Sequence, residues 1–85
     1  MFRITFSNSN ETPILIQVEP WACVYQLRKG EEIEFAADSQ GREEIFSIDE
    51  HKDHRFLTFL FSDEFFVVRD GALVHWKDFP SNMVD

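Results

Sequence analysis

The chain alternates between apolar and polar residues over most of its length, as a β-strand does when one of its faces is buried. Phe2, Ile4 and Phe6, for example, are separated by single polar residues, which predicts a first strand at the N-terminus. The same alternation predicts further strands over 14–19, 23–28, 32–37, 44–48 and 72–77. Short strands separated by polar turns are typical of antiparallel β-proteins. We therefore expect an all-β fold, a compact antiparallel β-sandwich or barrel of roughly seven to eight short strands.

Prolines and glycines predict where these strands end. Pro13 opens the second strand, and Pro20 predicts a bend over 19–21 because proline cannot donate a hydrogen bond to a neighbouring strand. Gly30 lies between the third and fourth strands, where a tight turn needs a residue that tolerates positive φ. These two strands should therefore form a hairpin.

The stretch 56–68 breaks the alternation, because "FLTFLF" and "FFVV" are apolar on both faces and are separated by the short turn "SDE". We interpret it as a hairpin of two strands. One alternative is that both faces are covered inside a sandwich. The other is that one face is an exposed apolar patch that forms the interface of a homodimer or a hetero-complex. The candidate interface residues are then Leu57, Phe59, Phe61, Phe66 and Val68.

Two segments carry weaker signals. Residues 39–54 are charged and poor in β-branched residues, so a short helix is an alternative to the strand over 44–48. Residues 78–85 have no pattern and are expected to form a loose tail of a single domain spanning 1–85.

The composition, 44% apolar and 28% charged, is that of an ordinary globular domain. No segment approaches the roughly 20 apolar residues that span a bilayer, and the N-terminus lacks the apolar core of a secretion signal. Cys23 is the single cysteine and cannot form an internal disulfide. These features favour a cytoplasmic protein that does not bind membranes; the alternative is a mature exported domain whose signal has been removed, which would have the same features.

Sixteen acidic residues against eight basic ones give a formal net charge of −8. Such a surface repels phosphate backbones, which disfavours nucleic acid, and attracts basic proteins. Our leading hypothesis is therefore a non-catalytic interaction protein that binds a basic partner, as an inhibitor, an immunity-type protein or an assembly subunit does.

The stretch "EPWACVYQLRKGEEIEF", residues 19–35, is the most distinctive in the chain. Alternation and a glycine turn explain most of it as structure, with the Trp21 ring closing the open end of a sandwich. The alternative is a ligand-binding surface in which Trp21 and Tyr25 form an aromatic wall and Glu19 supplies a charge. That wall would suit a cation or a planar molecule.

The same stretch resembles a pattern in small bacterial β-proteins whose activity is not established, Glu-Pro-Trp followed by Tyr-x-Leu-x-x-Gly-Glu. The resemblance covers about a fifth of the chain and implies a bacterial source and a β-fold. The chain departs from it at Lys29, where those proteins typically have proline.

Few residues in the chain suggest a catalytic, metal or ligand site. His51 and His54 lie in the acidic loop "DEHKDH" and are a weak alternative for a metal or ligand site, since two imidazoles in a turn can converge. His75 and Cys23 lie within predicted strands with no partner that would activate them. We expect no catalytic residues, no cofactor and no enzymatic activity.

Overall fold

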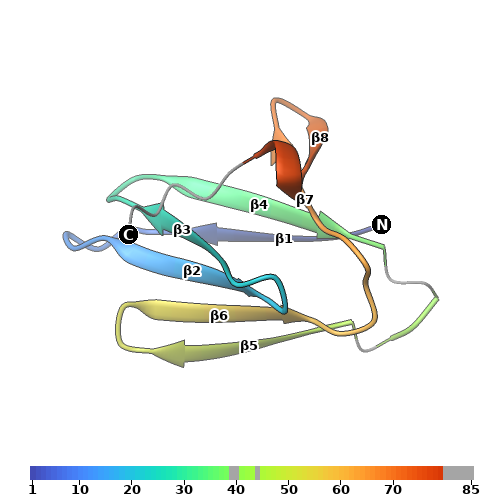
Figure 1. The fold of residues 1–85 in the computed structure, drawn as a ribbon. Helices are drawn as coiled ribbons and strands as arrows, with labels where there is room; N and C mark the ends of the chain where they lie inside the picture. Colours follow the sequence, from blue (N-terminus) through green and yellow to red (C-terminus); the bar gives the residue numbers. More distant parts are fainter. Residues whose placement is uncertain (39–40, 44, 80–85) are drawn as a thin grey trace.

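The computed structural model describes residues 1–38, 41–43 and 45–79 as two four-stranded β-sheets that pack face to face (Figure 1). We call the first sheet A, in the order β1 (Phe2–Ser7), β4 (Glu32–Ala37), β7 (Phe66–Arg69) and β8 (Ala72–His75). Sheet B has the order β3 (Cys23–Leu27), β2 (Ile14–Glu19), β6 (His54–Phe59) and β5 (Phe46–His51). A single 3-10 turn, η1 (Trp76–Asp78), follows β8. The predicted all-β sandwich is confirmed.

The core lies between the two sheets and consists of the inward-facing members of the alternating pattern. In β2, for example, Ile14, Ile16 and Val18 are buried, whereas the residues between them are half-buried on the outer face. The largest fully buried side chains come from both sheets and from the segment before β7, and include Tyr25, Phe35, Leu57 and Phe65. Period-two alternation therefore places the apolar residues in one layer, as the sequence predicts.

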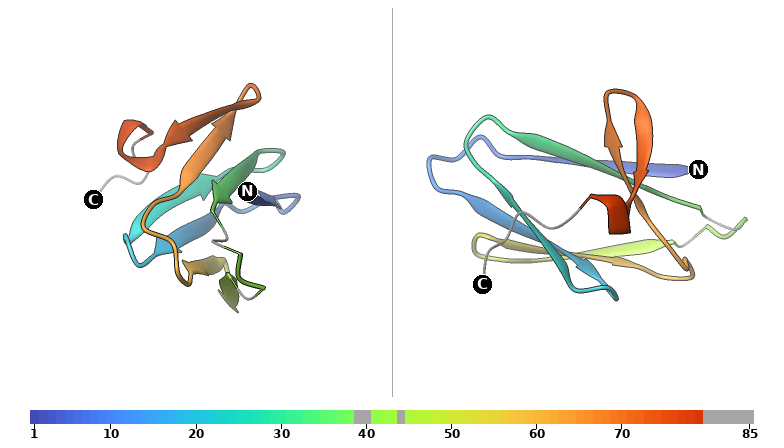
Figure 2. Two further views of the ribbon diagram at one scale, coloured as in Figure 1. Left: turned by 90° about the vertical axis from the view of Figure 1, so that its right-hand side faces the viewer. Right: turned by 45° about the horizontal axis from the view of Figure 1, so that its top comes forward.

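One strand pairing departs from the antiparallel prediction: β6 runs parallel to β2, with Leu15 opposite His54 and Val18 opposite Leu57. β5 and β6 form an antiparallel hairpin, and it is the second strand of this hairpin that pairs with β2. Pairing through β6 fixes the parallel direction and leaves β5 at the edge of sheet B. Figures 1 and 2 show β5 on the opposite side of the molecule from the β7–β8 hairpin.

Two predicted hairpins are wrong. The turn at Gly30 joins β3 of sheet B to β4 of sheet A, so these two strands do not pair with each other. The segment 56–68 is not a hairpin either. β6 belongs to sheet B and β7 to sheet A, so residues 60–65 carry the chain from one layer to the other.

The inward-facing positions of 56–68 still alternate, since Leu57, Phe59, Phe65 and Val67 are buried. The pattern is hidden in the sequence because the outward-facing Phe56, Phe66 and Val68 are apolar as well and lie half-buried. Phe59 and Phe65 stack across the core, with ring centroids 5.9 Å apart.

The segment 45–54 forms strands rather than the alternative helix, and β5 begins at Phe46. Glu44, where the pattern begins the strand, lies outside the described residues. The expected loose tail is corrected at Phe79, which packs against the core, while 80–85 lie outside the described residues. No helix of the described part of the chain has the length and apolarity needed to span a membrane.

Asn8, directly after β1, is a buried polar side chain that links two loops. Its amide nitrogen donates to the carbonyls of Thr12 and Leu27, both at 3.0 Å, and its side-chain oxygen accepts from the backbone of Asn10 at 2.9 Å. Its own backbone bonds to Glu31 and Gly30. Asn8 therefore holds the β1–β2 loop against the β3–β4 turn, with all its polar groups satisfied.

We predict that Asn8→Ala lowers the free energy of unfolding by about 2–4 kcal/mol, because it leaves the carbonyl of Leu27 without a donor at a buried position and that of Thr12 without one at a partly buried position. Urea denaturation measures the change, and Ser9→Ala, at the exposed neighbouring position, is the matched control. Equal stability of the two variants would contradict the structural role of Asn8.

Candidate functional site

The predicted aromatic wall of Glu19, Trp21 and Tyr25 does not form. Tyr25 is 1% exposed and faces the core, where its ring lies 5.4 Å from that of Phe35. Glu19 lies at the end of β2 on the outer face, where it accepts a hydrogen bond of 2.6 Å from the Gln17 side chain. The physical reason is strand geometry: Tyr25 pairs with Ile16, an inward-facing residue, so its side chain shares the inward face.

Trp21 has the structural role that the sequence suggests. It lies in the turn after the cis peptide bond between Glu19 and Pro20 and packs against the core at one end of the sandwich. Its ring centroid is 4.9 Å from that of Phe65 and 6.1 Å from that of Trp76. The indole therefore covers the end of the aromatic core.

Burial raises the pKa of the Tyr25 hydroxyl well above its ordinary value, and the neighbouring Cys23 thiol raises it further. Burial also raises the pKa of Cys23, although a hydrogen bond with Tyr25 acts in the opposite direction. A thiol with a raised pKa carries little thiolate at neutral pH and is a poor nucleophile. Cys23 and Tyr25 thus act as packing residues.

We predict that Tyr25, the single tyrosine, does not ionise in the folded protein near its ordinary pKa of about 10. Because the folded-state pKa is raised, the stability that the neutral phenol confers is fully present below this pH and is lost as the pH rises further. Tyrosinate absorbance should therefore appear together with the loss of the β circular dichroism signal. The urea-unfolded chain, titrating near pH 10, is the control, and ionisation at that pH in the folded state would contradict the burial.

The five candidate interface residues do not lie on one surface of the structure. Leu57 and Phe59 are buried in the core and are unavailable to a partner, which corrects that part of the prediction. Phe66 and Val68 lie half-buried on the outer face of sheet A, because they pair with the outward-facing Ala36 and Glu34. Phe61 is 53% exposed, with the Arg42 guanidinium 4.1 Å from the centre of its ring.

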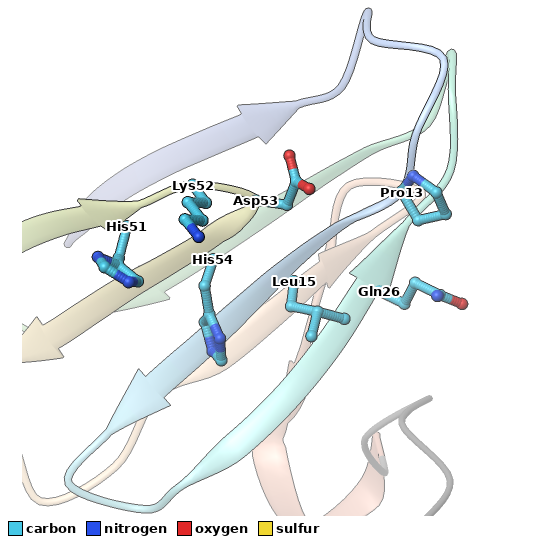
Figure 3. Close-up of a pocket in the computed structure, with 7 residues that line it drawn as sticks. All are labelled: Pro13, Leu15, Gln26, His51, Lys52, Asp53 and His54. Carbon is cyan, nitrogen blue, oxygen red and sulfur yellow. The ribbon is translucent and has the colours of Figure 1, made fainter.

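His51 and His54 lie opposite each other where the β5–β6 hairpin turns, and both line a pocket of about 400 Å³ that is open to solvent. The pocket follows one row across all four strands of sheet B, from His51 through His54 and Leu15 to Gln26 (Figure 3). Its remaining wall comes from Pro13 and the two turn residues, Lys52 and Asp53.

The two imidazoles differ in their surroundings. His54 lies parallel to the Phe56 ring, with centroids 4.3 Å apart, and its Nε2 is 3.2 Å from the amide oxygen of Gln17. His51 is exposed at the edge of the sheet. Among the described residues, no three His, Cys, Asp or Glu side chains gather in an arrangement that could hold a metal ion. The pocket therefore offers two imidazoles beside two aliphatic residues, one amide and the oppositely charged Lys52 and Asp53.

Sequence reasoning found the two histidines and missed the rest of the pocket. Leu15 is next to His54 only because β2 and β6 pair in parallel, a contact between residues almost forty positions apart. Gln26 joins the row through the pairing of β2 with β3, of which only the bend at 19–21 was predicted, and its outer-facing position carried no sign of a pocket. Strand alternation says which face a side chain takes and nothing about which strands are neighbours.

Comparison of the chain with protein-family models, curated proteins and solved structures finds no match. Neither these comparisons nor the described site residues give any positive indication of enzymatic activity.

Proposed function

We propose that this protein is a non-catalytic interaction module that binds a basic polypeptide partner. The observation that supports this most strongly is the location of its charge. None of the Asp and Glu side chains in the described part of the chain lies in the core; all are exposed or half-buried. These carboxylates do not contribute to the packing of the core. Their charge is therefore available to interact with other molecules.

Pairing within the chain cannot neutralise this surface, because acidic residues outnumber basic ones two to one. The ion pairs that form are mostly exposed, such as Lys29 with Glu11 and Arg3 with Glu34. Exposed pairs contribute only about 0–1 kcal/mol each, so they add little to stability. A negative potential of this kind steers basic partners toward the surface and accelerates their association.

We predict that a partner captured from extract of the source cell is basic and that it associates more slowly as salt increases. The variant E32Q/E43Q/D63N/D78N removes four exposed carboxylates and should slow association at low salt by roughly tenfold, with little change in dissociation. The variant E32D/E43D/D63E/D78E keeps the charge and is the matched control. Surface plasmon resonance measures both rates.

Two results would overturn the proposal. One is a captured partner that is acidic or neutral. The other is binding whose rate does not change between low salt and about 1 M salt, where the screening length is only about 3 Å.

A second candidate function is a small-molecule or metal-binding module, and the pocket shared by His51 and His54 favours it. This candidate predicts that Zn²⁺, Ni²⁺ or Cu²⁺ raises the melting temperature, since a ligand at about 100 times its Kd stabilises the folded state by about 2.7 kcal/mol. The rise should be lost in His51→Asn and kept in His75→Asn, which alters the histidine outside the pocket. Identical shifts in both variants, or none in the unaltered protein, would exclude the metal site.

A further inference from the structure

β5 is an edge strand: it pairs with β6, ends the order of sheet B, and has no neighbouring strand on its outer side among the described residues. It lies along the margin of the molecule in Figure 1. All its residues except the half-buried Phe46 are exposed. A strand in this position presents unpaired backbone groups that another extended segment can bond.

The hairpin geometry indicates which backbone groups are available. The turn between β5 and β6 has two residues, so His51 and His54 form the hydrogen-bonded pair that flanks it. The backbone N–H and C=O groups of alternate β5 residues then bond to β6, and those of the residues between them point away from β6. Ile48 and Glu50 therefore direct their N–H and C=O groups toward the open edge.

The apolar core is incompletely covered at the same place. Ile48 pairs with Leu57, so its side chain lies on the inner face, yet it is 39% exposed whereas Leu57 is fully buried. The Phe2 ring of β1 stacks on Phe46, with centroids 4.7 Å apart, and covers the start of β5 only. An added strand would shield the exposed part of Ile48.

Charge distinguishes this edge from the others. Of the four edge strands, β1, β3 and β8 contain no carboxylate, whereas β5 contains Asp49 and Glu50. Glu50 lies 3.6 Å from Arg55 of β6, at an exposed position, and Lys52 and His51 are the other cationic or titratable groups beside it. In the described part of the chain Asp49, on the outer face, has no ion pair.

We infer that β5 binds an extended basic segment of the partner by strand addition, a recognition mode that rests on the proposed function. The added strand places an apolar side chain beside Ile48 and lysines or arginines beside Asp49 and Glu50. Charged residues on an edge also prevent self-association. Here Asp49 and Glu50 determine which strand binds. A second copy of this chain would bring its own carboxylates and a net charge of −8 and would be repelled, whereas a basic strand is attracted.

The test uses capped seven-residue peptides and the ¹⁵N-labelled full chain. Two peptides carry adjacent lysines and a valine in a threonine background. The second has the residues of the first in reverse order, because the added strand can run parallel or antiparallel to β5. We expect one of them to shift the amide resonances of residues 46–50 and to slow hydrogen exchange at Ile48 and Glu50. A peptide of the same composition with its lysines separated is the sequence control.

Two further comparisons separate strand addition from simple charge attraction. N-methylation of the bonding backbone positions of the peptide keeps its charge and should abolish binding. The variant D49K/E50K should lower affinity at least about tenfold, whereas E32K/D63K, with the same change in net charge, should lower it much less. A two-dimensional amide spectrum verifies that both variants are folded.

The outcomes distinguish the two proposals. Absence of peptide binding at millimolar concentration, equal binding of the N-methylated peptide, shifts confined to another face, or equal losses in the two lysine variants would overturn strand addition. A partner from cell extract that is basic and salt-sensitive would still support the proposed function in each of these cases. Self-association of the unaltered chain through β5, seen in sedimentation, would instead assign the edge to a second copy.

Discussion

The aromatic contact around Phe65 is the interaction on which the rest of the structure depends. Its fully buried ring lies 5.9 Å from Phe35 of sheet A and 5.9 Å from Phe59 of sheet B. It also contacts Trp21 in the turn after β2 and Trp76 in η1. In a domain of 85 residues, which buries only about 60–65% of its unfolded surface, one such cluster accounts for a large part of the core.

That cluster explains why the most distinctive stretch of the sequence is structural. Trp21 and Tyr25 are of residue types that are common in binding surfaces. In this structure, however, Trp21 covers the end of the core and Tyr25 lies within it. With Trp21 and Tyr25 occupied in packing, the domain has mainly polar groups and a few exposed apolar residues, such as Ile48 and Phe61, left for contacts with other molecules. This division favours recognition through charge and backbone over recognition through a deep cavity.

The two proposed binding features follow from one topological choice. Because the β5–β6 hairpin joins sheet B through β6, His54 meets Leu15 and β5 remains an open edge. Joining through β5 would have closed this edge and separated His54 from β2. The same parallel pairing therefore creates the pocket and leaves Ile48, Asp49 and Glu50 at the margin of the molecule.

The sequence by itself determined the fold class, most strand positions, the bend at Pro20 and the surface location of the charge. These are local properties: alternation assigns each side chain to a face, and proline and glycine restrict the backbone wherever they occur. Only the tertiary structure decided that 56–68 crosses between layers, that Asn8 joins two loops, and that β6 rather than β5 pairs with β2. The order of strands depends on the contacts of whole faces, which residues distant in the chain supply together, and no local pattern records which strands become neighbours.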